Sequence, residues 1–211
     1  MLWSPNTQLH YPFENQANDY SGNARHGTVN GSGVYATRPN GGRCLYFDGV
    51  GDYVATPSFG LSGTVVWFSA DVRCKLYAAN LQQFLYGLPT YWVYRRINSF
   101  DFAVHYGVDY YASPNFFQSY EDAWVHVITV SDYTHRKTYF YRNALLVTST
   151  SLPAAALFPS AAAVYYVGGV SGLLTYGYLA NVKFGTLATM PPVAGMNANA
   201  NRLMLGLHPI W

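Results

Sequence analysis

Apolar and polar residues alternate along much of this chain with a period of two, which is the spacing of a β-strand with one buried face. The clearest example is the segment 65–76. One of its faces is apolar at every position: Val66, Phe68, Ala70, Val72, Cys74 and Leu76. The other face is mostly polar, so the pattern predicts a half-buried strand in the middle of a sheet.

Further segments alternate in the same way or are rich in β-branched residues, and they are predicted to be strands. They span residues 124–130, 138–141, 145–148, 164–167 and 178–184. Arg142 and Asn143 separate two of them and suit a hairpin turn. The Ala-rich segment 153–163 contains Pro153 and Pro159, which favours a loop. Many short strands with frequent turns, and no amphipathic helix, indicate an all-β protein built as a two-sheet antiparallel sandwich.

The C-terminal segment differs from the rest of the chain. Residues 190–211 lack strand alternation and end in a group of apolar side chains: Leu203, Leu205, Leu207, Ile210 and Trp211. A chain of 211 residues fits a single β-sandwich with an appendage. We therefore expect one domain over residues 1–189 and an extended arm over residues 190–211. The arm is predicted to dock onto a partner subunit, with packing along its own domain as the alternative.

The composition is poor in charge and rich in aromatic residues. Charged residues make up 10% of the chain, whereas an average soluble domain has about 25%. The chain has 20 Tyr, 12 Phe and 5 Trp. Tyr and Trp are enriched at interfaces because they bury a large body and keep a polar group. A surface covered by protein partners is one interpretation, and aromatic packing inside a large sandwich is the other.

Charge and hydropathy also exclude some partners. The net charge is +2 and the basic residues are scattered, so no patch for nucleic acid is expected. The charge-free stretch 143–182 is interrupted by proline and glycine, so no membrane-spanning helix is expected. The N-terminal residues have no basic region followed by an apolar core. We therefore expect no secretory signal and synthesis in a cytoplasm.

The two cysteines are predicted to be free thiols. Cys74 belongs to the apolar face of the segment 65–76. Cys44 precedes Leu45 and Phe47, whose shared face is the apolar one, so the Cys44 side chain points to the opposite face of its strand. One thiol pointing in and the other out argues against a disulfide and fits a reducing compartment.

Four segments resemble, in order, parts of laminin-G-like jelly rolls of the concanavalin-A-like lectin and glucanase superfamily. The first is residues 9–28, where an aromatic strand leads into the turn Asp19-Tyr-Ser-Gly-Asn23 and then His-Gly-Thr. The others are the Phe-Asp-Gly segment 45–54, the Trp-Val-His-Val segment 124–127, and residues 167–184 with their Gly-Gly turn. The resemblance implies a jelly-roll fold, and it is much less specific for function.

This resemblance also brings a candidate metal site, because family members often hold calcium at the loop rim. Calcium takes six to eight oxygen ligands, several of them carboxylates. The matching positions offer Asp19, Asp48 and Asp52. Gly51 and the pair Ala180-Asn181 stand where the family usually has acidic or amide residues. We therefore expect no cofactor, with calcium at the three aspartates as the alternative.

Catalytic motifs are not found in the sequence, and we expect the protein not to be an enzyme. Related glycosidases need two carboxylates facing each other, but the only two glutamates, Glu14 and Glu121, share no motif. The six histidines lack zinc-binding spacing, and no Gly-x-Ser-x-Gly turn is present. A Ser-His-Asp triad is not excluded by sequence alone. His126 lies in an apolar strand and is interpreted as a packed residue.

Binding is the remaining class of function, and two hypotheses follow. The first is a bacteriophage or other virion structural protein, such as a capsid decoration or cement protein or a tail or fibre module. It would be a homo-oligomer, with a trimer favoured, and its arm would contact protein partners in the particle. The alternative is a lectin-like module that binds host-surface glycans. Its aromatic platform would be Tyr91, Trp92, Tyr94, Tyr110 and Tyr111.

Overall fold

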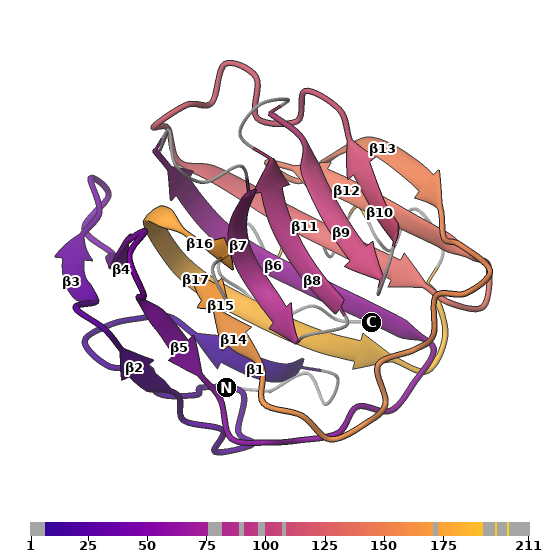
Figure 1. Ribbon diagram of the computed structural model, residues 1–211, viewed down its shortest axis with the longest axis horizontal. Coiled ribbons are helices and arrows are strands. Elements are labelled where there is room, and N and C mark those ends of the chain that lie inside the picture. Colours follow the sequence, from indigo (N-terminus) through magenta and orange to yellow (C-terminus); the bar gives the residue numbers. More distant parts are fainter. Residues whose placement is uncertain are drawn as a thin grey trace.

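The computed structural model describes residues 7–75, 82–88, 91–96, 100–106, 109–170 and 173–191, together with Asn197 and Arg202. Two large antiparallel sheets pack face to face, with β8 and β9 lying across β6 and β11 (Figure 1). The predicted all-β jelly-roll sandwich is confirmed. No helix in the described part of the chain is long and apolar enough to cross a membrane. The predicted arm lies almost wholly outside these residues, including all five of its apolar side chains.

One sheet has eight strands in the order β13-β12-β11-β6-β17-β4-β3, with β1 also beside β17. The strands are β13 (Leu145–Ser151), β12 (Lys137–Arg142), β11 (Val125–Asp132), β6 (Val65–Cys74), β17 (Tyr176–Leu187), β4 (Arg43–Asp48), β3 (Val34–Thr37) and β1 (Thr7–Tyr11). The longest pairing joins β6 to β17 and is interrupted by a bulge between Ala180 and Lys183. Asn181, inside this bulge, has a positive φ of 48°.

The other large sheet has seven strands in the order β10-β9-β8-β7-β14-β5-β2. They are β10 (Asp109–Ser113), β9 (Phe102–Tyr106), β8 (Tyr91–Arg96), β7 (Gln82–Leu88), β14 (Tyr166–Val167), β5 (Tyr53–Ala55) and β2 (Thr28–Asn30). A small third sheet pairs β15 (Gly169–Val170) with β16 (Leu173–Leu174). Sequence alternation did not reveal β7 to β10, two of which, β8 and β10, carry aromatic residues at consecutive positions.

The main hydrophobic core lies between the two large sheets. The apolar face of β6 enters it as predicted. Tyr86 lies at its centre, with ring centroids 5.3 Å from Phe68, 4.6 Å from Phe184 and 5.7 Å from Tyr165. The predicted hairpin is also present, and its turn is Asn143-Ala144, both with positive φ. Two consecutive positive φ values match a tight hairpin turn whose twist suits the strands.

The strand β6 is central as predicted, but the expectation that it is half-buried is wrong. Both of its faces are buried, and only Arg73 is of intermediate exposure. The reason is a second hydrophobic cluster on the other face of the eight-stranded sheet, in which Val65 and Trp67 pack with Ile128 and Val130. A central strand with an apolar cluster on each side has no solvated face.

Both cysteines are free, as the sequence predicted, and both are buried, although Cys44 was expected to point outward. Cys74 belongs to the main core, while Cys44 lies outside it, so the two side chains are on different faces. Burial raises the pKa of both thiols, that of Cys74 to about 11. Neither thiol is therefore a reactive thiolate near neutral pH.

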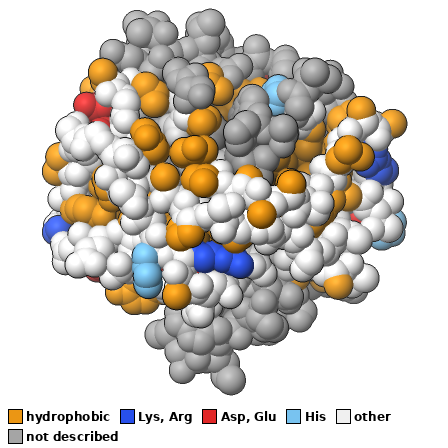
Figure 2. All heavy atoms as spheres, turned by 60° about the horizontal axis from the view of Figure 1, so that its bottom comes forward, with side chains coloured by type: hydrophobic (Ala, Val, Ile, Leu, Met, Phe, Trp, Pro, Cys, Tyr) orange, Lys and Arg blue, Asp and Glu red, His pale blue; other side chains and the backbone are white. Residues whose placement is uncertain are grey.

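The surface carries little charge. Figure 2 shows hydrophobic side chains spread over one face with few acidic or basic groups between them. Large apolar side chains are strongly exposed at several separate places: Val34, Val50, Leu145, Leu146 and Leu157. Scattered apolar residues are ordinary on soluble proteins, so only those beside a cavity or other built feature point to a binding site.

Candidate functional site

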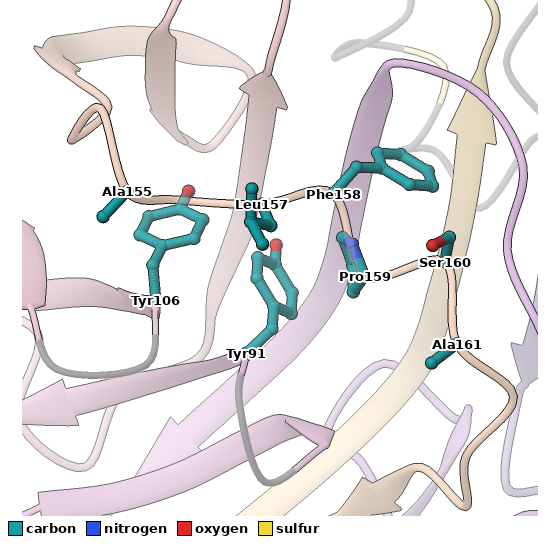
Figure 3. Close-up of a pocket in the computed structure, with 8 residues that line it drawn as sticks. All are labelled: Tyr91, Tyr106, Ala155, Leu157, Phe158, Pro159, Ser160 and Ala161. Atoms are coloured by element: carbon teal, nitrogen blue, oxygen red, sulfur yellow. The ribbon is translucent and has the colours of Figure 1, made fainter.

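A cavity of about 310 Å³ opens at an edge of the sandwich, where the segment between β13 and β14 crosses from one large sheet to the other. Tyr91, at the start of β8, and Tyr106, at the end of β9, form one side. The segment 155–161 forms the other side, and both tyrosine side chains point toward it (Figure 3). The described residues that line the cavity include no charged side chain. The chemistry of this lining is therefore that of aromatic faces, methyl groups and hydroxyls.

The tyrosine side of the cavity is held in place by the sheet and by buried hydrogen bonds. Tyr91 and Tyr106 are directly opposite each other in the β8–β9 pairing, with ring centroids 5.5 Å apart. The Tyr106 hydroxyl lies 2.6 Å from Ser131 Oγ and 2.7 Å from Thr138 Oγ1, both on the facing sheet. This hydroxyl therefore connects the two sheets and fixes the orientation of the ring at the cavity wall.

The loop side of the cavity is anchored by Arg136. Its guanidinium donates to the carbonyl of Ala156 at 2.9 Å and also to the carbonyls of Pro153 and Ala154. Residues 153–156 belong to no strand, so the three hydrogen bonds from one guanidinium restrain this part of the loop.

The anchored segment presents one strongly exposed apolar side chain at the rim. Phe158 packs edge-on against Tyr133 with ring centroids 5.4 Å apart. Between Ala156, which is 3% exposed, and Phe158, the side chain of Leu157 is 82% exposed. Leu157 thus stands at the mouth of a cavity whose two sides are both fixed, which is the arrangement of a pre-formed binding site.

The aromatic platform predicted from sequence is only partly recovered. Tyr91 lines the cavity, but Tyr91 and Tyr94 are 2% and 1% exposed, so they do not form an exposed platform. The physical reason is that β8 is an interior strand, flanked by β7 and β9. The side chains of Trp92, Tyr110 and Tyr111 lie outside the described residues. Tyr106, another aromatic residue that the sequence offers for such a platform, also lines the cavity. The segment 155–161 was missed, because no local pattern places it beside Tyr91.

Asp19, one of the three predicted calcium ligands, organises the turn that follows β1. Its Oδ1 accepts hydrogen bonds from the backbone amides of His10 at 2.9 Å and Ser21 at 2.8 Å. Its Oδ2 accepts from the amide of Arg25 at 2.9 Å and from the Ser21 hydroxyl at 2.8 Å. The compact turn predicted for residues 19–23 is confirmed, and four donors already surround this carboxylate.

Asp48 and Asp52 lie together in a different turn. The backbone amide of Asp48 donates to Asp52 Oδ2 at 2.9 Å, and Ser32 donates to Asp52 through its amide and to Asp48 through its hydroxyl. No group of three or more His, Cys, Asp or Glu suited to a metal ion occurs among the described residues. The structure does not bring the three predicted calcium ligands together, because each carboxylate is used to close a turn by accepting backbone N–H groups.

A buried polar network on the outer face of the eight-stranded sheet was not visible in the sequence pattern. His126 Nδ1 lies 2.6 Å from Asp71 Oδ1, and its Nε2 lies 3.1 Å from Ser69 Oγ. This order of groups resembles a Ser-His-Asp triad. However, Ser69 is in the middle of β6 with 0% of its surface exposed, and a nucleophile must be reachable by its substrate. His126 is buried, as expected for a packed residue, but its neighbours Asp71 and Ser69 are polar.

The network stabilises the charge of Asp71. Arg38 Nη1 donates to Asp71 Oδ2 at 2.7 Å, and the Asn181 side-chain amide donates to the same oxygen at 2.8 Å. Burial by itself would raise the pKa of Asp71, but the hydrogen bond and charge of His126, together with Arg38 and Asn181, hold that pKa below its usual value. The bulge in β17 brings Asn181 to this position, so the irregularity in the strand has a structural role.

No family model and no curated protein sequence matches this chain. Solved structures do match it. Domain 4 of AbnA, a GH43 extracellular arabinanase from Geobacillus stearothermophilus solved in complex with arabinotriose, is 16% identical over 94% of this chain and 98% of that domain, with a TM-score of 0.73. The binding domain of Paraclostridial Mosquitocidal Protein 1 is 11% identical, with a TM-score of 0.70.

A further match is botulinum neurotoxin type C, whose cell entry depends on interaction with two ganglioside molecules; it is 10% identical with a TM-score of 0.67. The chain covers 51% of the neurotoxin chain and 52% of the mosquitocidal protein chain, so it spans about half of each. At these identities the likeness defines the fold. The chain is a jelly-roll β-sandwich.

Proposed function

We propose that the chain is a non-catalytic carbohydrate-binding module, and that the cavity beside Tyr91 and Tyr106 takes a neutral sugar. The observation that carries this proposal is the uncharged, tyrosine-walled cavity between two anchored sides. Aromatic rings pack against the C–H faces of sugars. A charged sugar would enter without a counter-ion in the cavity lining, which disfavours it.

The size of the cavity limits the ligand. Its volume of about 310 Å³ is at the lower end of the usual range for small-molecule sites, roughly 300–1,000 Å³. It suits roughly one or two sugar rings, such as the end of a longer glycan. The likeness to an arabinanase domain solved with arabinotriose, and to a neurotoxin that interacts with gangliosides, supports a sugar as the ligand.

The chemistry of the lining supports binding without hydrolysis. Glycosidases place two carboxylates about 5–10 Å apart around the scissile bond, and no carboxylate is found in the part of the cavity lining that the structure describes. The virion assembly hypothesis gains no support from the matched structures, and the arm on which it relied lies almost wholly outside the described residues. It stays a prediction, as do the homo-oligomer and the virion location. The finer laminin-G-like assignment rests on the four segment resemblances.

The proposal is tested by screening the purified protein on a glycan array, with a variant that fills the cavity. Ala155 lines the cavity and its side chain is exposed, so Ala155→Trp blocks the site without disturbing the core. Ala154 is equally exposed but does not line the cavity, and Ala154→Trp is the matched control. Neutral glycans are expected to bind the wild type and Ala154→Trp, and to be lost with Ala155→Trp. Absence of binding to every glycan would overturn the proposal.

A further inference from the structure

A cluster of partly exposed aromatic side chains lies on the outer face of the eight-stranded sheet, away from the cavity. Tyr46 in β4 is paired directly with Tyr178 in β17, and Tyr176 lies two positions before Tyr178. The neighbouring residues Leu45 and Leu179 enter the main core, so the three tyrosines point to the opposite face. We call Tyr46, Tyr176 and Tyr178 the tyrosine platform.

The rings of the platform are close enough to form one continuous surface. The Tyr46 centroid is 4.9 Å from that of Tyr178 and 6.3 Å from that of Tyr176. Trp124, just before β11, extends the surface, with its centroid 6.2 Å from that of Tyr178. All four side chains are of intermediate exposure. The platform is therefore an open aromatic surface on a rigid sheet, unlike the enclosed cavity.

Two basic side chains lie over this surface: Arg73, near the end of β6, and Lys75, directly after β6. Lys75 Nζ lies 5.8 Å from the ring centroids of Tyr176 and Tyr178 and 5.9 Å from that of Tyr46. The guanidinium carbon of Arg73 lies 5.6 Å from the Tyr178 centroid. These distances are within the range of cation–π attraction. The rings thus hold the ammonium of Lys75 at the centre of the platform.

Two acidic residues in the described part of the chain lie beside the platform, and both accept hydrogen bonds. Asp122 accepts from Arg73 at 3.0 and 3.1 Å through its two carboxylate oxygens. Asp48 faces Tyr46 and accepts from the backbone amide of Val50 and the hydroxyl of Ser32. Burial, and then a hydrogen bond with Tyr176, raise the pKa of Tyr46 to about 12, so this phenol keeps its proton at neutral pH.

We propose that the tyrosine platform, with Lys75 and Arg73, is a second glycan-binding site and that it takes an acidic sugar, one that carries a carboxylate or a sulfate. The open rings suit stacking of a sugar face, and the ammonium of Lys75 beside them forms a charge-assisted hydrogen bond with the anionic group. The inference extends the proposed carbohydrate-binding function to another face and another class of ligand. Binding at the platform does not require the cavity.

The test is isothermal titration of the wild-type protein with trigalacturonate and with a chondroitin sulfate tetrasaccharide. The fully methyl-esterified form of trigalacturonate is the neutral counterpart of the first probe. At least one acidic probe is expected to bind, more weakly as salt is raised, because exposed charge interactions are screened. The ester is expected to bind at least about ten-fold more weakly than the acid, the size of a charge-assisted hydrogen bond. Absence of binding by both acidic probes overturns the proposal.

Substitutions then locate the site. Lys75→Gln is expected to weaken acidic-sugar binding at least about ten-fold, whereas Lys137→Gln, on the exposed side of β12, leaves it unchanged. Tyr178→Ala removes a stacking ring and is expected to weaken binding, and Tyr178→Phe, which keeps the ring, is expected to restore it. Equal affinity in the wild type and Lys75→Gln contradicts the proposal.

The cavity variant separates the two proposals. Ala155→Trp is expected to keep full affinity for the acidic sugar, because the platform is on another face. If Ala155→Trp removes acidic-sugar binding, the platform proposal fails and the cavity is the site. If the wild type binds neutral glycans and neither acidic probe, the platform proposal fails and the carbohydrate-binding function stands.

Discussion

His126 Nδ1 and Asp71 Oδ1 are 2.6 Å apart, and the two residues are directly opposite each other in the β6–β11 pairing. Both are buried. Asp71 also accepts from Arg38 and from Asn181 in β17. One carboxylate therefore joins β6 to its neighbours on both sides, in the sheet that carries the tyrosine platform.

Removing the charge of Asp71 is predicted to destabilise the protein. Asp71→Asn removes the carboxylate from His126, which is buried, and from Arg38, whose side chain is 12% exposed. Breaking a buried pair costs about 3 kcal/mol or more of unfolding free energy. Ser69→Ala, at the end of the same network, removes one hydroxyl and is expected to cost about 1 kcal/mol. Urea denaturation monitored by circular dichroism measures both. A loss below about 1 kcal/mol for Asp71→Asn contradicts a stabilising role for the network.

Lys183 gives the stability a predicted dependence on alkaline pH. Its side chain has 0% exposure, and desolvation lowers its pKa from 10.5 to about 8, partly opposed by the charge of Asp71. Between these values the unfolded chain binds more protons than the folded one, so the unfolding free energy rises with pH from about 8 upward. Lys183→Met is expected to flatten this rise.

The window for that measurement ends near pH 9.5. Burial raises the pKa of Tyr86, Tyr91 and Tyr133, whereas tyrosines in the unfolded chain ionise near pH 10. Stability is therefore lost again as pH rises through about 10. The two buried thiols oppose the lysine effect in this window, because burial raises their pKa whereas cysteines in the unfolded chain ionise near pH 8.5. The lysine effect is therefore measured as the difference between the wild type and Lys183→Met in urea titrations at pH 7.5, 8.5 and 9.5. An equal rise in the wild type and in Lys183→Met rules out Lys183 as its source.

The Tyr106 hydroxyl is predicted to contribute to stability more than to the shape of the cavity. Tyr106→Phe removes the hydrogen bonds to Ser131 and Thr138 but keeps the ring at the cavity wall. We expect a loss of about 1–2 kcal/mol with sugar binding retained. Tyr20→Phe is the control, because Tyr20 is 45% exposed and a change there is expected to stay within about 0.5 kcal/mol. Thermal unfolding and a glycan titration distinguish the two effects.

Calcium is predicted to leave the stability unchanged. The carboxylate of Asp19 accepts from three backbone amides and one hydroxyl, and Asp48 and Asp52 close a separate turn. A ligand that binds only the folded state raises the melting temperature. The melting temperature is therefore expected to be the same in millimolar calcium as in excess chelator. A rise of several degrees with calcium shows that these carboxylates form a site after all.

Local patterns in the sequence predicted those parts of the fold that depend on short-range spacing. Alternation located β6, β11 and β17 and the β12–β13 hairpin, and the side chain of Asp19 accounted for the first turn. The four strands β7 to β10 were missed, and in β8 and β10 consecutive aromatic residues such as Tyr91 and Trp92 hide a period of two. Burial of the second face of β6 depends on partners in β11 and β17, which no single segment reveals.

The candidate sites could not be predicted because they depend on pairing between distant segments. Tyr46 meets Tyr178 only because β4 lies beside β17. The cavity likewise forms because the segment 155–161 crosses over Tyr91 and Tyr106. The aromatic-rich composition indicated that aromatic surfaces exist, and it favoured the dense aromatic segments 91–94 and 110–111 as the glycan-binding surface. In the structure the aromatic surface with cations comes from tyrosines of two distant segments, Tyr46 in one and Tyr176 and Tyr178 in the other.

The most direct test of the central claim is to locate the bound sugar by NMR with ¹³C-methyl-labelled leucine. Leu157 stands at the rim of the cavity, whereas Leu145 and Leu146 are exposed on the edge strand β13. During titration with a neutral glycan that binds on the array, the Leu157 methyl signals are predicted to shift and those of Leu145 and Leu146 to stay in place. Shifts at Leu145 and Leu146 with Leu157 unchanged would contradict a carbohydrate site at this cavity.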